Sequence, residues 1–94
     1  VTVDRVITEV ARTMNVSPED IRSEKRSAPI SQARQVASYV VRSVTNLSMK
    51  AIGEEFGTRD HSTIVYAVRR AEERMKKDTS FRNRVDDIIK NIGG

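Results

Sequence analysis

Apolar residues recur at intervals of three and four positions along almost the whole chain. This spacing places them on one face of an α-helix, and no segment alternates apolar and polar residues for long enough to predict a strand. A chain of 94 residues without cysteine has no disulfide framework and can bury one modest core. The sequence therefore predicts a single all-α domain over residues 1–94.

Capping residues divide this domain into segments. Thr2, Ser17 and Ser48 stand where helix N-caps are wanted. Asn15 stands just past the end of the first helix, and Gly57 stands where a left-handed residue ends a helix. On the long helix, the face opposite the apolar stripe carries Ser31, Gln35, Ser38 and Arg42. The predicted segments are leading helices over 1–22, a basic loop over 23–29, a long helix over 30–46, a helix-turn-helix over 48–77 and a C-terminal helix over 80–92.

Positive charge is concentrated in the middle of the chain. Residues 22–70 hold nine basic and four acidic side chains, whereas residues 1–21 hold two basic and four acidic ones. The remaining residues, 71–94, are nearly balanced, with six basic and five acidic side chains. Because a polyanion is the natural partner of such a segment, the charge distribution favours nucleic-acid binding.

The middle segment also has the order of a helix-turn-helix, in which a short helix and a tight turn precede a helix that enters the DNA major groove. On a helical wheel, Ile64 and Val68 lie on one side of the second helix, and Ser62 and Tyr66 lie on the other. Its first turn carries short or planar groups that can hydrogen-bond base edges. These are Asp60, His61, Ser62 and Thr63, in a helix that opens with Arg59. Each of them is also an ordinary residue for a helix start, so the combination carries the prediction.

The string Gly57-Thr58-Arg59-Asp60-His61-Ser62-Thr63, followed by Tyr66-Ala67, resembles the signature of the C-terminal DNA-binding domain (domain IV) of DnaA, the bacterial chromosomal replication initiator. The basic loop Ser23-Glu24-Lys25-Arg26-Ser27, the pair Arg34-Gln35 and the segment Leu47-Ser48-Met49-Lys50 also resemble family positions. The resemblance covers roughly residues 3–76 without a gap.

The resemblance implies a compact helical fold with a Trp-repressor-like helix-turn-helix core. It also implies sequence-specific binding of double-stranded DNA at DnaA boxes in the replication origin, through both grooves. Arg26 would enter the minor groove, and Asp60, His61, Ser62 and Thr63 would read the major groove. The positions implied near the phosphate backbone are Lys25, Arg34, Gln35, Arg42, Lys50, Tyr66 and Arg70.

Four positions depart from the usual family pattern. Ser62 stands where threonine is common, Tyr66 where histidine is frequent, and Ala33 where proline is frequent. Glu24 adds a negative charge beside the loop arginine. These departures bear on sequence preference and affinity.

Enzymatic function is not expected. Asp60, His61 and Ser62 are consecutive, so on a helix they point about 100° apart and form no catalytic relay. One histidine and no cysteine make a metal site unfavourable, and the chain has no phosphate-binding glycine loop. We therefore expect no cofactor here. ATP is expected only in the ATPase module of the full initiator, which this sequence does not contain.

The remaining expectations concern partners and context. No apolar run approaches the roughly 20 residues of a membrane span, so we expect a cytoplasmic, nucleoid-associated protein without a membrane partner. The start at Val1 and the end at Gly93-Gly94 indicate a fragment. We expect the isolated domain to be a monomer. Two alternatives stay open, namely a helix-turn-helix transcriptional regulator and a module that docks protein regulators through its first helix or residues 72–77.

Overall fold

Six helices make up the part of the chain that the computed structural model describes, residues 1–58 and 60–93. This part contains no strand, which confirms the predicted all-α class. Arg59, with which the predicted reading helix opens, lies outside the described residues, as does Gly94. The helices are α1 (Val3–Met14), α2 (Pro18–Ile21), α3 (Ala28–Val44), α4 (Met49–Glu55), α5 (Ser62–Lys77) and α6 (Thr79–Gly93).

The predicted caps explain where several of these helices begin and end. The hydroxyls of Thr2, Ser17 and Ser48 each accept a hydrogen bond from the backbone N–H three residues further on, in each case at 3.1 Å. Asn15 and Gly57 have φ angles of 58° and 75°, in the left-handed region that ends a helix. The capping residues read from the sequence are therefore confirmed.

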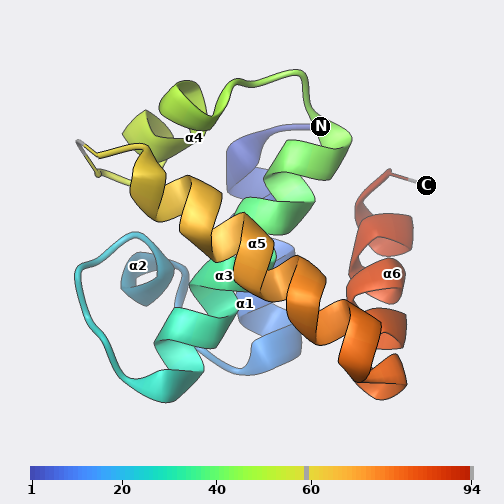
Figure 1. Cartoon of the computed structure of the whole chain (residues 1–94). Coiled ribbons are helices and arrows are strands. Elements are labelled where there is room, and N and C mark those ends of the chain that lie inside the picture. The colour runs from blue at the N-terminus through green and yellow to red at the C-terminus, as the bar shows by residue number, and fades with distance from the viewer. Residues whose placement is uncertain (59, 94) are drawn as a thin grey trace.

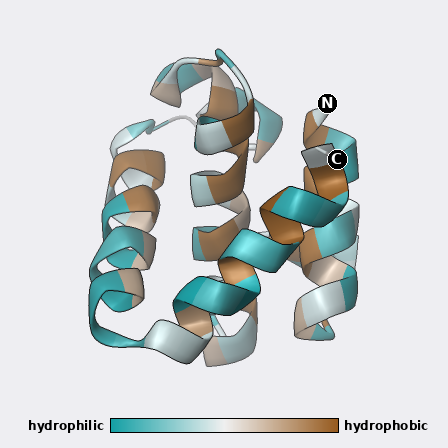
Figure 2. Cartoon of the chain, turned by 90° about the vertical axis from the view of Figure 1, so that its right-hand side faces the viewer, coloured by the Kyte–Doolittle hydropathy of each residue, from teal (hydrophilic) through white to brown (hydrophobic). Residues whose placement is uncertain are grey.

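Helix α3 is the centre of the fold. It packs against α1, α5, α2, α6 and α4 and passes between α1 behind it and α5 in front (Figure 1). Coloured by hydropathy, α6 alternates hydrophilic and hydrophobic stretches along its length, as an amphipathic helix does (Figure 2). The largest fully buried apolar side chains are Val6, Ile7, Val10, Ile21, Val36, Val40, Val41, Ile52, Ile64, Val85 and Ile88. None of the helices in residues 1–58 and 60–93 combines the length and apolarity needed to cross a membrane.

Two features of α3 differ from the prediction. The helix begins at Ala28 and not at Ile30, because Pro29 is accommodated in the first turn, where a missing backbone N–H leaves no hydrogen bond unmade. Ser38 was placed on the outward face but is fully buried. Its hydroxyl donates to the carbonyl oxygen of Arg34 at 2.8 Å, so a small polar residue is satisfied inside a helix that is surrounded by others. The loop before α3 is thus shorter than predicted.

Candidate nucleic-acid interface

Helices α4 and α5 form the predicted helix-turn-helix, and Gly53 allows their close approach. A Cβ atom at Gly53 would lie 3.2 Å from Cγ2 of Thr58 and 3.7 Å from Cα of His61. The carbonyl oxygen of Gly53 also accepts a hydrogen bond from the backbone N–H of Thr58 at 2.9 Å. The lack of a side chain at position 53 therefore sets how near the turn and the start of α5 lie to α4.

The start of α5 is held by Asp60. Its Oδ1 accepts a hydrogen bond from the backbone N–H of Ser62 at 3.0 Å, and its own N–H donates to Oγ1 of Thr58 at 3.3 Å. The hydrogen bonds from Ser62 lower the pKa of the Asp60 carboxyl below its usual value. The first helical residue is Ser62, and His61 directly before it is the N-cap residue. Asp60 thus has a structural task in holding the first backbone N–H of α5, in addition to the predicted contact with bases.

The first turn of α5 is open to solvent. His61, Ser62 and Thr63 are exposed, while Ile64 in the same turn is buried in the core. The helical wheel therefore assigned Ser62 and Ile64 to the correct faces. Backbone N–H groups and side-chain hydroxyls at this end of a helix are suited to hydrogen-bonding bases and phosphates.

The basic loop before α3 is ordered by local hydrogen bonds. Nζ of Lys25 lies 2.8 Å from Oδ1 of Asp20, and this contact lowers the pKa of the Asp20 carboxyl. The hydroxyl of Ser23 donates to the carbonyl oxygen of Asp20 at 2.7 Å and accepts from the backbone N–H of Lys25 at 3.1 Å. Arg26 is exposed, and no hydrogen bond or ion pair within residues 1–58 and 60–93 involves its guanidinium. Lys25 is folded back, whereas Arg26 projects from a fixed loop.

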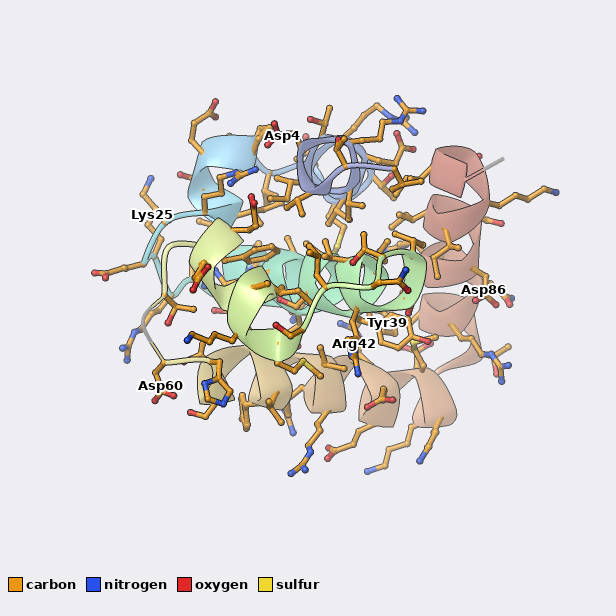
Figure 3. The ribbon with its side chains drawn as sticks, turned by 90° about the horizontal axis from the view of Figure 1, so that it is seen from above. Asp4, Lys25, Tyr39, Arg42, Asp60 and Asp86 are labelled. Carbon is orange, nitrogen blue, oxygen red and sulfur yellow. The ribbon has the colours of Figure 1, made fainter. Side chains whose placement is uncertain are left out.

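One groove joins this loop to the start of α5. It has a volume of about 790 Å³. Arg26 and Glu24 line it from the loop, and Asp60 and Thr63 line it from the helix-turn-helix. Seen from above, the labelled residues Lys25 and Asp60 lie at the same end of the molecule (Figure 3). The fold thus brings together two segments that are more than thirty positions apart in the sequence. Arg26 and the first turn of α5 consequently face a common space.

Arg34 borders the same groove but is turned toward the protein. Its Nε donates to the carbonyl oxygen of Ile21 at 2.9 Å. Its Nη2 lies within hydrogen-bonding distance of three further carbonyl oxygens, those of Asp20 at 3.1 Å, Ser23 at 2.6 Å and Lys25 at 3.1 Å. Desolvation lowers the pKa of this guanidinium, which nevertheless stays charged because an arginine does not lose its proton in proteins. A phosphate contact by Arg34 stays a prediction.

A second hollow, of about 420 Å³, lies between α3 and the C-terminal half of α5. Gln35 and Arg70, both predicted near phosphates, line it together with Arg74 and Lys77. Glu73 also lines it and pairs with Arg70 at 3.7 Å. Tyr66, which is 61% exposed, lies on the same helix with the Arg70 guanidinium carbon 6.0 Å from its ring centre. The structure thus places Gln35 and Arg70 around one hollow, with Tyr66 one turn before Arg70 on α5.

Neither Arg42 nor Lys50 lines the groove. In Figure 3 the labelled Arg42 is well separated from Lys25 and Asp60, which mark the groove end of the molecule. Its Nη1 donates to the carbonyl oxygen of Leu47 at 3.3 Å, just before α4, and Lys50 is exposed in the first turn of α4. Their assignment to the phosphate backbone stays a prediction.

Three residues of the site, Arg22, Gly53 and Thr58, were not predicted from the sequence. Arg22 links the end of α2 to the end of α4, and Thr58 braces Asp60 through its hydroxyl. The Thr-x-Asp spacing before a helix is a recognisable local signal for such a hydroxyl–backbone turn. The contact of Arg22 joins residues 33 positions apart, so no local pattern could have found it.

Comparison with known proteins shows which family this chain is similar to. A family model described as "Bacterial dnaA protein helix-turn-helix" matches residues 3–71. A chromosomal replication initiator protein DnaA from Thermodesulfovibrio yellowstonii is 37% identical over 94 residues, which is 100% of this chain and 22% of that protein. A protein of the same name from Lachnoclostridium phytofermentans is 41% identical over 92 residues, covering 98% of this chain and 20% of that protein. The chain therefore spans about a fifth of the length of these relatives.

Proposed function

This chain belongs to the bacterial DnaA helix-turn-helix family, and from that membership we propose that it binds double-stranded DNA at DnaA boxes of the replication origin. In this proposal it is the part of an initiator that locates the origin when chromosomal replication begins. The observation that carries the proposal is the shared groove, which is lined by Arg26 from one side and by Asp60 and Thr63 from the other. Such an arrangement can contact the major groove and the adjacent minor groove of one DNA duplex together.

In the major groove, the first turn of α5 reads base edges. The exposed His61, Ser62 and Thr63 offer an imidazole and two hydroxyls, and the Thr63 methyl can contact the methyl group of a thymine. Ile64 and Val68 fix the opposite face of α5 in the core, so the reading face cannot rotate away. This rigidity favours base discrimination, because misaligned donors lose their hydrogen bonds.

In the minor groove, Arg26 supplies the second contact. A narrow minor groove has an enhanced negative potential that attracts an inserted arginine, and its pattern distinguishes mainly A·T from G·C pairs. Arg26 is suited to this because its guanidinium is exposed and carries no ion pair within the described residues. Phosphate contacts by Gln35, Arg42, Lys50, Tyr66 and Arg70 would then set the register of the protein on the duplex.

The proposal involves no chemical step and no cofactor in this chain. The ATPase activity expected of a full initiator would belong to other parts of such a protein, and regulators that act on the bound domain would be protein partners. A DnaA box is asymmetric, and a single copy of the protein presents both Arg26 and the first turn of α5 to the DNA. We therefore propose that a monomer binds each site at the nucleoid.

The test is a titration of the protein into two labelled duplexes, one with a single DnaA box and one with the same bases scrambled, at two salt concentrations. We expect tighter binding of the box, and on both duplexes a steep loss of affinity with salt, because neutralised phosphates release counterions. Equal affinity for the two duplexes would contradict the proposed function. An affinity that salt does not change would indicate a protein partner.

A further inference from the structure

We propose that Arg34 acts on DNA through Arg26, as a positioning residue that holds the basic loop in the conformation that enters the minor groove. This inference rests on the proposed function, since it concerns how one of its two contacts is prepared. It assigns to Arg34 a task inside the protein in place of a direct contact with a phosphate.

The hydrogen bonds of Arg34 carry the inference. Its guanidinium reaches four backbone carbonyl oxygens, those of Asp20, Ile21, Ser23 and Lys25, at 2.6 to 3.1 Å. These four residues span the end of α2 and the loop up to the position directly before Arg26. One side chain from α3 thus gathers the whole path of the backbone that leads to Arg26.

The contact with Lys25 is the most direct link. The carbonyl group of Lys25 belongs to the same planar peptide unit as the backbone nitrogen of Arg26. When Nη2 of Arg34 holds that oxygen at 3.1 Å, it therefore restricts the orientation of the unit from which Arg26 projects. Without this contact the peptide can rotate, and the guanidinium of Arg26 would sample directions away from the groove.

The carbonyl oxygens also leave Arg34 little freedom to bind a phosphate. Both Nε and Nη2 donate to the backbone, and the side chain is partly buried beside the loop. Turning toward DNA would leave carbonyl groups of Asp20, Ile21, Ser23 and Lys25 without this donor. A hydrogen bond from a charged group contributes more stability than one between two neutral groups. The inward orientation of Arg34 is therefore favoured.

A loop that is already ordered in the free protein loses no conformational freedom when it binds DNA. This order raises the affinity without a new contact. Ser23 supports the same loop from within, since its hydroxyl bonds both Asp20 and Lys25. The inference therefore predicts that a change at Arg34 and a change at Ser23 both weaken binding only as long as Arg26 is present.

The test is a double-mutant cycle on the box duplex, with dissociation constants from fluorescence anisotropy for wild type, Arg34→Lys, Arg26→Ala and the pair. Lysine keeps the charge but lacks the planar fork that reaches several carbonyls. We expect Arg34→Lys to weaken binding about tenfold in the wild-type background, a factor typical of one lost base contact. In the Arg26→Ala background the same substitution should weaken binding less than about twofold. Arg84→Lys, at an exposed position of α6, is the matched control and should change nothing.

A second variant and a modified duplex keep the test independent of folding. Ser23→Ala removes two loop hydrogen bonds without touching a charge, and it should behave as Arg34→Lys does, with a smaller effect. Replacing the adenines of the box with 2,6-diaminopurine adds an amino group in the minor groove only. Wild type should lose affinity on this duplex, and Arg34→Lys should lose less, because its minor-groove contact is already weakened.

Two results would overturn the inference. If Arg34→Lys binds as tightly as wild type, the charge alone matters and Arg34 is a phosphate contact. If Arg34→Lys weakens binding equally with and without Arg26, it acts elsewhere in the domain. In either case wild type would still prefer the box, so the proposed function would stand. Loss of that preference in the wild type itself would overturn both.

Discussion

Nη1 of Arg22 donates a hydrogen bond to the backbone carbonyl oxygen of Glu55, 2.7 Å away, and so joins the end of α2 to the end of α4. The same guanidinium pairs with Asp4 at the start of α1 and lies 3.9 Å from Oε2 of Glu55. The carbonyl oxygen of Arg22 also lies 3.8 Å from the place where a side chain at Gly57 would begin. The start of the basic loop and the turn of the helix-turn-helix are therefore fixed to each other.

The first prediction concerns this link. Replacing Arg22 with methionine keeps an unbranched apolar stem and removes the contacts with Glu55 and Asp4. We expect the free energy of unfolding to fall by about 1 kcal/mol, because one charge-assisted hydrogen bond and partly exposed ion pairs are lost. Denaturant titration measures the change. Arg82→Met is the control, since the ion pair of Arg82 lies within α6 at 4.0 Å. A loss as large in Arg82→Met as in Arg22→Met would contradict the assignment.

The second prediction concerns the close contact at Gly53. Alanine there gains up to about 1 kcal/mol in helix propensity but meets Cγ2 of Thr58, a methyl group that can shift slightly. We expect these effects to offset each other, so that Gly53→Ala unfolds at nearly the wild-type temperature. Gly53→Val adds two further carbon atoms beside Ile64 and His61 and should destabilise by about 1 to 3 kcal/mol.

Thermal unfolding of both Gly53 variants decides this prediction. Gly93→Ala is the matched control, because a Cβ at Gly93 meets nothing within 4 Å. Stability of Gly53→Val equal to that of the wild type would show that α4 can move away from α5 without loss. The close approach would then not define the start of the reading helix.

The third prediction is a pH dependence at Asp60. Its pKa is lowered in the folded protein by the hydrogen bonds from Ser62, so the folded state favours the carboxylate. The resulting stability is fully present above the unfolded pKa of about 4 and is lost as the pH falls through the lowered folded pKa. The difference in stability between wild type and Asp60→Asn should therefore shrink below about pH 4. A difference that stays constant from neutral to acid pH would show that the carboxylate charge does not hold the helix start.

The fourth prediction concerns residues assigned to the phosphate backbone. Lys50→Met should weaken binding to a box duplex and to a scrambled duplex by a similar factor, since a phosphate contact carries no sequence information. The slope of log affinity against log salt should also fall by about 1. Lys90→Met, on α6, is the control. A loss confined to the box duplex would move Lys50 to the base-reading group.

Local features of the fold could be predicted from the sequence because each depends on a few neighbouring residues. The hydroxyl of Ser48 needs only the backbone three residues ahead, and the burial of Ile64 beside the exposed Ser62 follows from helical spacing alone. The all-α class followed in the same way, since no stretch favoured a strand. The start of α3 was placed two residues late, because Pro29 was interpreted as a loop residue although the first turn of a helix also accepts proline.

Long-range contacts could not be predicted in this way. Nothing in the residues next to Arg34 distinguishes it from an outward-facing arginine. Only the packed fold shows its guanidinium among the carbonyl groups of the loop. Ser38 lies on a helix whose outward side is covered by other helices, which no single-helix pattern reveals. The shared groove of Arg26 and Asp60 likewise depends on how α2, α4 and α5 pack, although the family resemblance had implied that both segments meet DNA.

The central claim is that two separate contacts, Arg26 and the first turn of α5, together give preference for a DnaA box. The most direct test is the ratio of the dissociation constants for the scrambled and box duplexes, measured for wild type, Arg26→Ala and His61→Ala at one salt concentration. We predict that each variant loses about 1 to 3 kcal/mol on the box and little on the scrambled duplex, so that the ratio falls in both. A ratio that either substitution leaves unchanged would contradict the claim for that residue.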